Sequence, residues 1–415
     1  MQEKTDQQIY EDFAAQLCEW GKSGALPASG NQDIRYGLEL QRKRMEKYHV
    51  KIEYRLNLRE GRQEHVSSAA FSDLHYTNKL VWKAFRKEAD YFREGRKCLS
   101  VKDNQLLYTI VTWLNGGTDR APYICPNCGA VSQVSELLEG CPYCHTRFLM
   151  SDLYPKVTNY YFLRDYGLGE QEAGNSVRKW MVAGAAAGMV LRLPGILLGL
   201  FHGENLFFLL LSTLLTMGVT AGLGYFALSL SLAFRVFKDG FKQAPRAAAQ
   251  IKAKKELTSF MKQFDPGFTF EYFFGKVQSL VKILMFADDR ENLAVYEGRP
   301  EECSFDDIAD AQFEGAVSLN ACRVEGNYCH LDLGVYMTDV YCRNQGLRQQ
   351  SDRFRIGLCR NISHPVDYGF SIKGVSCKSC GASFDATRER LCPYCRSRYD
   401  LKEDDWVITY IRRQP

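Results

Sequence analysis

This chain of 415 residues lacks several features that would assign it to a common class of protein. Its first ten residues, MQEKTDQQIY, are polar and contain no apolar core, so we expect no secretory signal. Its formal net charge is only +4, which is too small by itself to indicate nucleic-acid binding. No nucleophile elbow, phosphate loop or open metal site supports catalysis. The sequence therefore favours a non-catalytic protein.

Charge is missing from one long stretch. Residues 206–234 form an apolar run without a charged side chain, and about 20 apolar residues are enough to cross a bilayer as a helix. A second run, residues 180–201, contains Arg192 and Pro194 near its middle. A central arginine costs about 3 kcal/mol on membrane-insertion scales. This run therefore either crosses the membrane or forms a re-entrant or interfacial helix. We predict a transmembrane hairpin over residues 178–234.

Eight cysteines form two quartets of nearly the same design. In each quartet, two Cys-x-x-Cys pairs are separated by eleven or twelve residues, and a glycine follows the first pair. The quartets are Cys125, Cys128, Cys141 and Cys144, and Cys377, Cys380, Cys392 and Cys395. Four thiolates on two tight turns are typical of a closed, structural Zn(II) site. We predict two structural zinc ions per chain, with rubredoxin-type iron as the main alternative.

The remaining cysteines follow no spacing rule. We interpret them as small, buried, apolar residues in a reducing compartment. They are Cys18, Cys98, Cys303, Cys322, Cys329, Cys342 and Cys359.

The membrane topology follows from the cysteines and from the basic residues. Zinc thiolates need reduced cysteines, so both quartets should lie on the reducing side, which requires an even number of crossings. Basic residues flank the two apolar runs, and the short loop between the runs has no lysine or arginine. We therefore expect a multi-pass protein of the cell membrane with both soluble parts in the cytoplasm.

A basic stretch follows the second apolar run. Each basic residue near an anionic membrane surface contributes about 1 kcal/mol of attraction. The stretch either contacts lipid headgroups or forms a solvated helix. Its basic residues are Arg235, Lys238, Lys242, Arg246, Lys252, Lys254 and Lys255.

The soluble part before the membrane shows both helical and strand periodicity. We predict an amphipathic helix around Tyr10, Phe13, Ala14 and Leu17. Strict alternation predicts a half-buried strand over residues 50–59. Further elements are expected as a helix over residues 79–93 and strands over residues 106–114 and 157–163.

The part after the membrane begins with helical signals and ends with strands. Asp265 and Pro266 are expected to open a helix as its cap and first-turn proline. The apolar face of this helix is expected to contain Phe270, Phe273, Phe274, Val277, Leu280, Val281 and Leu284. A second short helical segment is expected around Asp288, Asp289 and Leu293. Long strands are then predicted over residues 309–324 and 328–342, with shorter ones over residues 354–358 and 406–411. In both soluble parts a quartet lies between two strands, so we interpret each zinc ribbon as an insertion at the tip of a β-hairpin.

These observations divide the chain into five parts. They are an amino-terminal helix and linker (1–30), an α+β domain with the first ribbon (31–168, ribbon 122–149), the hairpin (178–234), a basic juxtamembrane helix (235–262) and an α+β domain with the second ribbon (263–415, ribbon 374–400).

The last part resembles the Tim-forty-four-like domain family, which includes the import-motor tether of the mitochondrial inner membrane and bacterial relatives. The residues that carry the resemblance are Asp265, Pro266, Phe268, Phe273, Leu280, Asp289, Leu293 and Trp406, together with the small, apolar stretch 184–199. The resemblance implies a cystatin-like cone, with helices on a curved antiparallel sheet, and a membrane-tethered binding domain connected with protein transport. The two ribbons and the long amino-terminal part are absent from the mitochondrial tether, so its chaperone partners do not transfer to this chain.

Three functions remain open at this point. The favoured one is a membrane-anchored, zinc-binding scaffold or adaptor that binds membrane lipids and as yet unidentified protein partners. The second is ribosome or nucleic-acid binding through the ribbons, for which Arg388, Arg390, Tyr394, Arg396 and Arg398 are candidates, although nearby acidic residues cancel their charge. The third is a cone-fold enzyme that uses His330 and Asp332 as an acid–base pair.

Overall fold

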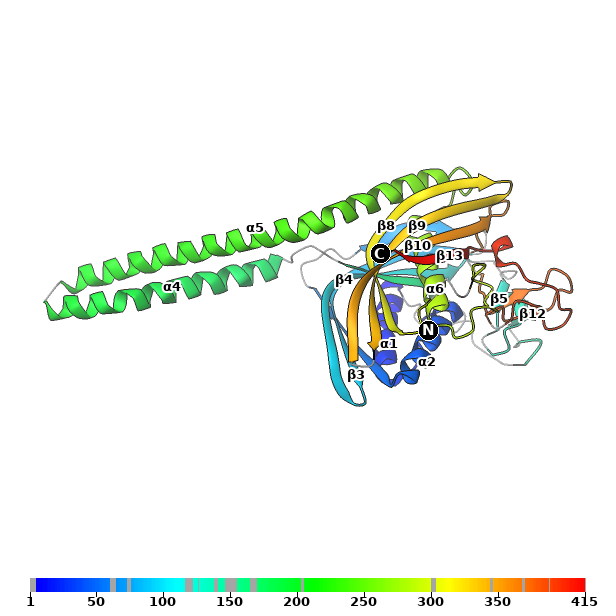
Figure 1. The fold of residues 1–415 in the computed structure, drawn as a ribbon, viewed down its shortest axis with the longest axis horizontal. Helices are drawn as coiled ribbons and strands as arrows, with labels where there is room; N and C mark the ends of the chain where they lie inside the picture. The colour runs from blue at the N-terminus through cyan, green and yellow to red at the C-terminus, as the bar shows by residue number, and fades with distance from the viewer. Residues whose placement is uncertain are drawn as a thin grey trace. The chain divides into compact units, whose positions relative to one another are not determined.

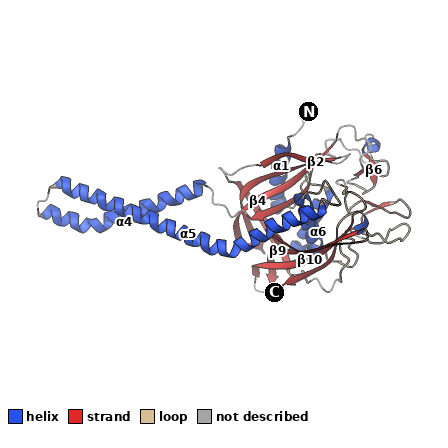
Figure 2. Ribbon diagram, turned by 90° about the horizontal axis from the view of Figure 1, so that it is seen from above, coloured by secondary structure: helices blue, strands red, loops and turns tan. Residues whose placement is uncertain are grey.

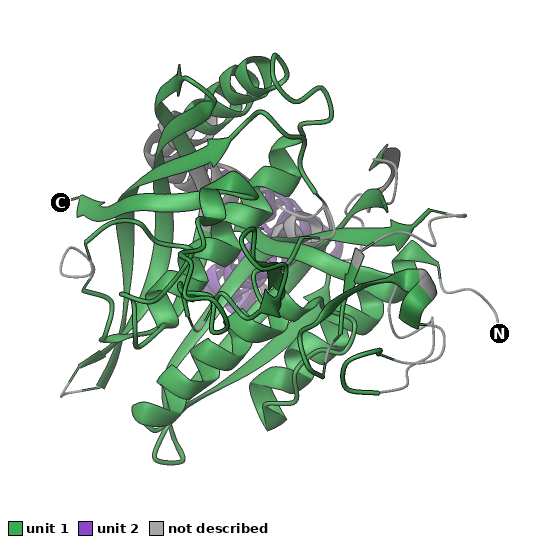
Figure 3. Cartoon of the chain, turned by 90° about the vertical axis from the view of Figure 1, so that its right-hand side faces the viewer, with its two compact units in different colours: residues 1–58, 63–165, 249–415 green, residues 59–62, 166–248 purple. Residues whose placement is uncertain are grey.

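The protein has a mixed α+β fold with antiparallel sheets and a long helical hairpin, as seen in a computed structural model (Figure 1). The structure describes residues 5–59, 65–72, 76–115, 122–125, 127–137, 141–145, 155–164, 170–202, 205–299, 304–343, 346–367, 370–387 and 389–414. The chain forms two compact units (Figure 3). Unit 1 contains residues 1–58, 63–165 and 249–415, and unit 2 contains residues 59–62 and 166–248.

The amino-terminal half of unit 1 has two helices and an antiparallel sheet. The helices are α1 (Asp6–Ser23) and α2 (Gln32–Lys47). The sheet has the strand order β1 (Val50–Leu58), β3 (Tyr76–Arg93), β4 (Arg96–Leu114) and β7 (Lys156–Arg164), and β2 (His65–Ser72) also pairs with β3.

Helix α1 forms where the sequence predicts it. Thr5 and Gln8 form a reciprocal capping box at its start, and Gly24 ends it in the left-handed conformation. Tyr10, Phe13, Ala14 and Leu17 are buried, and the Tyr10 hydroxyl donates to the Leu107 carbonyl at 3.0 Å. The predicted apolar face therefore packs on the sheet.

The expected helix over residues 79–93 is wrong, because this segment is strand β3. Its apolar residues Val81, Phe85 and Ala89 are four apart, which is a helical spacing. On the strand they share one face with Lys83 and Lys87, which are also buried. Because these two lysines are polar, the sequence does not show the alternation of apolar and polar residues that is typical of a strand.

The carboxy-terminal half of unit 1 has one helix over a second sheet. The helix is α6 (Phe270–Phe286), and the strand order is β8 (Ile308–Glu325), β9 (Tyr328–Arg343), β10 (Gly346–Asn361) and β13 (Val407–Gln414). Two short hairpins accompany the large sheets: β5 (Pro122–Ile124) with β6 (Val131–Gln133), and β11 (Val375–Ser376) with β12 (Ser383–Phe384).

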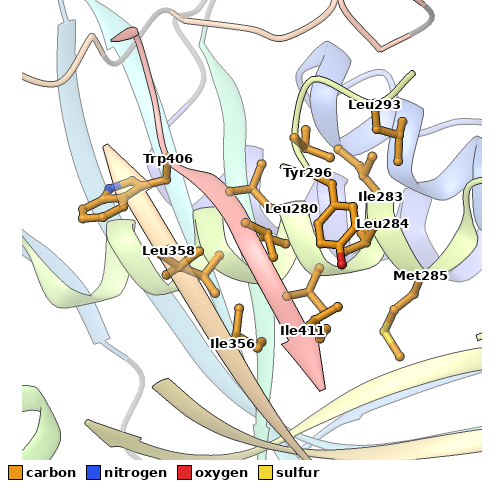
Figure 4. Close-up of a cluster of buried hydrophobic side chains, with 14 of the residues drawn as sticks. Leu280, Ile283, Leu284, Met285, Leu293, Tyr296, Ile356, Leu358, Trp406 and Ile411 are labelled. Atoms are coloured by element: carbon orange, nitrogen blue, oxygen red, sulfur yellow. The ribbon is translucent and has the colours of Figure 1, made fainter. Parts of the chain in front are cut away.

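The apolar face predicted for α6 is confirmed, because all of its residues are buried. Figure 4 shows Leu280, Ile283 and Leu284 of this helix beside Ile356 of β10 and Ile411 of β13. About 1.5–3 kcal/mol is gained for each such side chain that is fully buried. This core joins α6 to its sheet.

The start of α6 differs from the prediction. Asp265 and Pro266 form a turn before the helix, in which Asp265 Oδ1 accepts from the Gly267 N–H at 3.1 Å. The helix follows Thr269 instead, which caps it without a side-chain hydrogen bond. Asp265 satisfies its own neighbouring backbone, so it cannot also cap a helix five residues later.

The short helical segment expected around Asp288, Asp289 and Leu293 is also absent, since these residues are in bends and extended chain. Asp289 Oδ1 accepts from the Glu291 N–H at 3.1 Å, and such local side-chain bonds compete with a helix.

The two halves follow the same plan. Apart from α2 and β2 of the first half, each has a helix, then three antiparallel strands in sequence order, then a short hairpin with a cysteine quartet, then a fourth strand that pairs with the third. In both fourth strands a threonine is the extra residue of a β-bulge, Thr158 in β7 and Thr409 in β13. The predicted insertion of each ribbon between paired strands is therefore confirmed.

A backbone bridge after the helix is also repeated. The segment after α1 pairs with β7 at Gly30 and Val157, and the segment after α6 pairs with β13 at Tyr296 and Ile408, both in parallel. Each bridge consists of two hydrogen bonds of 2.8–2.9 Å. Val157 and Ile408 directly precede the two bulged threonines, so the two halves match residue by residue here.

The two halves belong to one compact unit, although the sequence suggested two separate soluble domains. Lys276 of α6 forms ion pairs with Asp33 of α2 at 3.6 Å and with Asp405 at 2.7 Å. The buried Arg44 of α2 donates to the carbonyl of Phe286 at the end of α6 at 3.4 Å. Polar contacts between residues about 250 positions apart have no periodic signal in the sequence.

Unit 2 is formed by α4 (Glu170–Phe201) and most of α5 (Leu206–Met261), which run side by side (Figure 2). Two segments are long and apolar enough to cross a membrane, Arg178–Leu198 and Leu206–Ala227. Gly184 and Gly188 of α4 allow close contact with Thr220 of α5, because a Cβ atom on either glycine would lie within 2.4 Å of Thr220. Arg192 donates to Ser212 Oγ at 2.8 Å, which gives this arginine a partner inside the hairpin.

Candidate metal centres and the surface around them

The structure brings each cysteine quartet together as predicted. Within each quartet the four sulfur atoms lie within 4.8 Å of one another. The closest pairs are 3.6 Å apart in the first quartet and 3.5 and 3.7 Å apart in the second. A tetrahedron with metal–sulfur bonds of about 2.3 Å has edges of about 3.8 Å. Each quartet can therefore hold one metal ion, and the geometry is compatible with Zn(II).

Tight turns place the sulfur atoms. Gly129 and Gly381 have φ angles of 76° and 72°, a left-handed conformation that glycine adopts without strain. Each donates its N–H to the carbonyl of the first cysteine in its quartet, at 2.9 and 2.8 Å. The glycines noted in the sequence thus close the first turn of each ribbon.

The second turn of each ribbon has the same form without a glycine. His145 and Arg396 follow the second pair and have φ angles of 57° and 62°. The His145 N–H donates to the Cys141 carbonyl, and the Arg396 N–H donates to the Cys392 carbonyl, both at 2.8 Å. These two residues were not predicted from the sequence, because a residue other than glycine rarely adopts the left-handed conformation.

Hydrogen-bond donors surround the sulfur atoms. Asn127 Nδ2 lies 3.6 Å from Cys144 Sγ, and Ser397 Oγ lies 3.1 Å from Cys395 Sγ. The Ser397 hydrogen bond lowers the pKa of Cys395 to about 6, whereas desolvation raises the pKa of Cys128 to about 12. Four thiols at this separation cannot all ionise without a cation, and a divalent metal removes that conflict.

The two ribbons contact each other at their bases. The Val131 N–H of the first ribbon donates to Ser383 Oγ of the second at 3.2 Å. A cavity of about 330 Å³ lies beside this contact, with Ile124 and Val131 from the first ribbon, and Val375, Lys378 and Tyr399 from the second, in its wall. This cavity has no signal in the sequence, because the residues that form it are far apart in the chain.

Each ribbon also exposes a tyrosine at the same position of its second Cys-Pro-Tyr-Cys turn. Tyr143 is 68% exposed and Tyr394 is 71% exposed. A tyrosine side chain is large and rigid and can donate a hydrogen bond, so it is common in protein interfaces. The ribbons therefore present two matched aromatic contact points.

The arginines proposed for nucleic-acid binding are only partly available. Arg390 Nε donates to the Leu293 carbonyl at 3.1 Å, so this guanidinium is used inside the fold. Arg398 forms an ion pair with Asp400 at 3.3 Å. Arg396 is exposed, and Arg388 lies outside the described residues.

His330 and Asp332 are not placed as an acid–base pair. They alternate with the core residues of β9, so they lie on the opposite face of the sheet. Asp332 accepts from Arg355 Nε at 2.9 Å, and its pKa is lowered overall, with burial opposing the hydrogen bonds of Arg355. Neither residue lines any of the cavities found among the described residues.

The basic stretch lies on α5, which continues without a break to Met261. Lys252 lies 3.8 Å from Glu256, and Lys254 pairs with Glu271. Lys255 is exposed. The side chains of Arg235, Lys238, Lys242 and Arg246 are outside the described part of the chain.

The cysteines outside the quartets are free wherever they are described. Cys329, Cys342 and Cys359 are buried as predicted, and burial raises the pKa of Cys329 to about 12. Cys18 and Cys322 are half-buried, whereas Cys98 is exposed, contrary to the prediction. Cys303 lies outside the described residues.

Comparison of the chain with models of protein families, with curated proteins and with solved structures finds no match.

Proposed function

We propose that this protein is a membrane-anchored, zinc-binding scaffold or adaptor that binds protein partners at the cytoplasmic membrane face. The observation that carries the proposal is that segments from before and after the apolar hairpin fold together into unit 1. Unit 1 contains both of the matched ribbons. Closed four-cysteine sites leave no open coordination position, so the ribbons stabilise and present surfaces and do not catalyse a reaction.

The segments that make up unit 1 support a topology in which the chain crosses the membrane twice. Residues 1–58 and 63–165 precede the hairpin and residues 249–415 follow it, yet they share one folded unit. Parts of one folded unit must lie on the same side of a membrane. The hairpin then crosses twice, with both apolar segments spanning the bilayer.

The cysteines support the cytoplasmic side for unit 1. All described cysteines are free, including the exposed Cys98, and thiolate ligands need a reducing compartment. Zn(II) is the proposed metal, because four thiolates in a closed tetrahedral arrangement suit it and it undergoes no redox change.

The packing of α6 on the β8–β13 sheet supports the proposed cone and the proposed relation to Tim-forty-four-like domains. Trp406, one of the residues on which that resemblance rests, contacts Phe273 of α6 with ring centroids 5.2 Å apart. In the proposed function this domain positions the second ribbon beside the first.

Photo-crosslinking in intact cells tests the proposal. A photoreactive phenylalanine analogue replaces Tyr143 or Tyr394, and we expect both positions to crosslink to the same protein. Leu58 is 49% exposed on β1 and provides the control position, which should not give that product. Lack of a reproducible product from both tyrosines would contradict the adaptor function, and crosslinks to RNA alone would favour the nucleic-acid alternative.

A further inference from the structure

A second polar cavity lies where the two halves of unit 1 meet, away from the ribbons. It has a volume of about 30 Å³. Its wall includes α1, α2, β1, β3 and β7 of the first half, and α6 and β8 of the second. A water molecule needs about 10–15 Å³ on this scale, so the cavity holds one or two small particles.

The polar groups in its wall are unevenly satisfied. Asp310 is fully engaged, because its carboxylate accepts from Gln41 Nε2 at 2.8 Å, Tyr91 Oη at 2.7 Å, Gln312 Nε2 at 3.0 Å and Tyr54 Oη at 3.3 Å. The carboxylate therefore has little capacity left for another donor.

Donors remain without acceptors around the same cavity. Trp20 Nε1 and Gln278 Nε2 are completely buried and have no hydrogen-bond partner. Lys87 is 4% exposed, and its ammonium group lies over the rings of Phe162 at 4.0 Å and Tyr54 at 4.7 Å without a carboxylate contact. An unpaired buried donor costs about 1–3 kcal/mol, and an unpaired buried charge costs more.

The side chains that line the cavity carry a net positive charge, which favours an anion in the same way as the unpaired donors. Lys87 and Lys282 are its basic residues and Asp310 is its acidic residue, so the wall carries one net positive charge. Burial lowers the pKa of Lys87 to about 8, and the negative charge of Asp310 opposes this shift without cancelling it.

We propose that this cavity binds a single halide-sized anion, chloride under ordinary conditions, next to Lys87. A monatomic anion fits the volume, is an acceptor for the N–H donors that the wall supplies and neutralises the net charge. Because both halves line the cavity, the bound anion would stabilise their association. This site is independent of the ribbons and of the proposed adaptor function.

A chloride titration of the full-length, metal-loaded protein in detergent tests the proposal. Gluconate, which is too large for the cavity, replaces chloride at constant ionic strength and neutral pH. We expect a saturable rise in the thermal unfolding midpoint with chloride or bromide, and none with gluconate. Equal midpoints in chloride and gluconate would show that water fills the cavity and would overturn the proposal.

Two variants separate the site from general salt effects. Lys87→Met should abolish the difference between chloride and gluconate. Lys83→Met is the matched control, since Lys83 lies two residues away on the same strand face but pairs with Glu11 at 2.9 Å, and this variant should keep the difference. A chloride effect that persists in Lys87→Met would overturn the proposal.

A measurement on the unaltered protein covers the case in which Lys87→Met fails to fold. Chloride bound in the cavity should broaden the ³⁵Cl NMR line, and bromide should reverse the broadening by competition. A line width that does not change on addition of bromide would overturn the proposal.

Discussion

Arg44 shows how a single buried side chain joins the two halves of unit 1. Its guanidinium donates to the Phe305 carbonyl at 2.8 Å and to the carbonyls of Phe286 and Ala287 at 3.4 Å. The last two carbonyls are at the end of α6, where backbone acceptors lack partners within the helix. Arg44 thus connects α2 to the end of α6 and to the segment before β8.

Arg44→Met should lower the free energy of unfolding by about 3 kcal/mol, because it leaves several buried carbonyls without donors. Urea unfolding of the full chain in detergent measures the change. Arg42→Met on the same helix is the control, since the Arg42 side chain is 41% exposed and has only an ion pair with the exposed Glu46 and a long hydrogen bond of 3.5 Å to the Ser23 carbonyl, so it should change stability by less than about 0.5 kcal/mol. Equal effects of the two substitutions would argue against this role for Arg44.

Asp339 should make the folding stability of the protein depend on pH. It is fully buried, neither carboxyl oxygen has a hydrogen-bond partner, and desolvation followed by the nearby Asp352 raises its pKa well above the usual value. Arg413 and Asp310 also face it, and they act in opposite directions. Because its pKa is higher in the folded state, its contribution to stability is complete at low pH and is lost as pH rises through the folded pKa.

Asp339→Asn should therefore gain stability over the original protein as pH rises, by up to about 1.4 kcal/mol per pH unit. Urea unfolding between about pH 6 and about pH 8 measures this difference, in a range where the proposed zinc sites should stay loaded. A difference that is constant over this range would show that Asp339 is ionised in the fold.

Buried polar side chains were the residues whose positions could not be predicted from the sequence. Lys83 and Lys87 are on the core face of β3 because Glu11 and the aromatic rings of Tyr54 and Phe162 receive them. Those partners come from other elements, so only the folded chain makes a lysine acceptable on that face. The cysteine quartets were predictable because metal ligation depends on local spacing.

At the scale of elements, each ribbon is an independent insertion and should bind its metal independently. Cys380→Ser should reduce the zinc content from about two to about one per chain, because the first quartet is untouched. Cys98→Ser, which alters an exposed cysteine outside both quartets, is the control and should keep both metals. Inductively coupled plasma mass spectrometry measures the ratio, and iron in place of zinc would contradict the metal assignment.

The hairpin depends on close packing between its two helices. A Cβ atom at Gly188 would lie 2.1 Å from Thr220 Oγ1, so Gly188→Leu should separate α4 from α5. We expect faster amide hydrogen exchange in both apolar segments, measured by mass spectrometry in detergent. Gly222→Leu is the matched control, because open space surrounds that position and exchange should not change. Equal exchange in both variants would mean that the helices do not pack through Gly188.

Elements were predictable where one periodic pattern dominated. The strands of the second sheet alternate clearly, and α6 has a continuous apolar face, so both were found in the sequence. The start of α6 was not, because Asp265 bonds to its own turn and the cap at Thr269 uses no side-chain hydrogen bond.

At the scale of the whole molecule, unit 1 consists of two copies of one plan. The bulged residues Thr158 and Thr409 and the two parallel bridges occur at equivalent positions. The sequence indicated only the repeat of strand, ribbon and strand. The bridges are made by backbone groups, which no side-chain pattern specifies, and the union of both halves depends on contacts across about 250 residues.

The central proposal is that both halves of unit 1 lie on one side of the membrane. Accessibility of epitope tags in intact cells measures this, with tags at either end of the chain and a third in the loop after His202. We expect only the loop tag to react with an impermeant antibody, and both end tags to react after the membrane is opened. End tags on opposite sides of the membrane would contradict it, because the two halves could not then form unit 1.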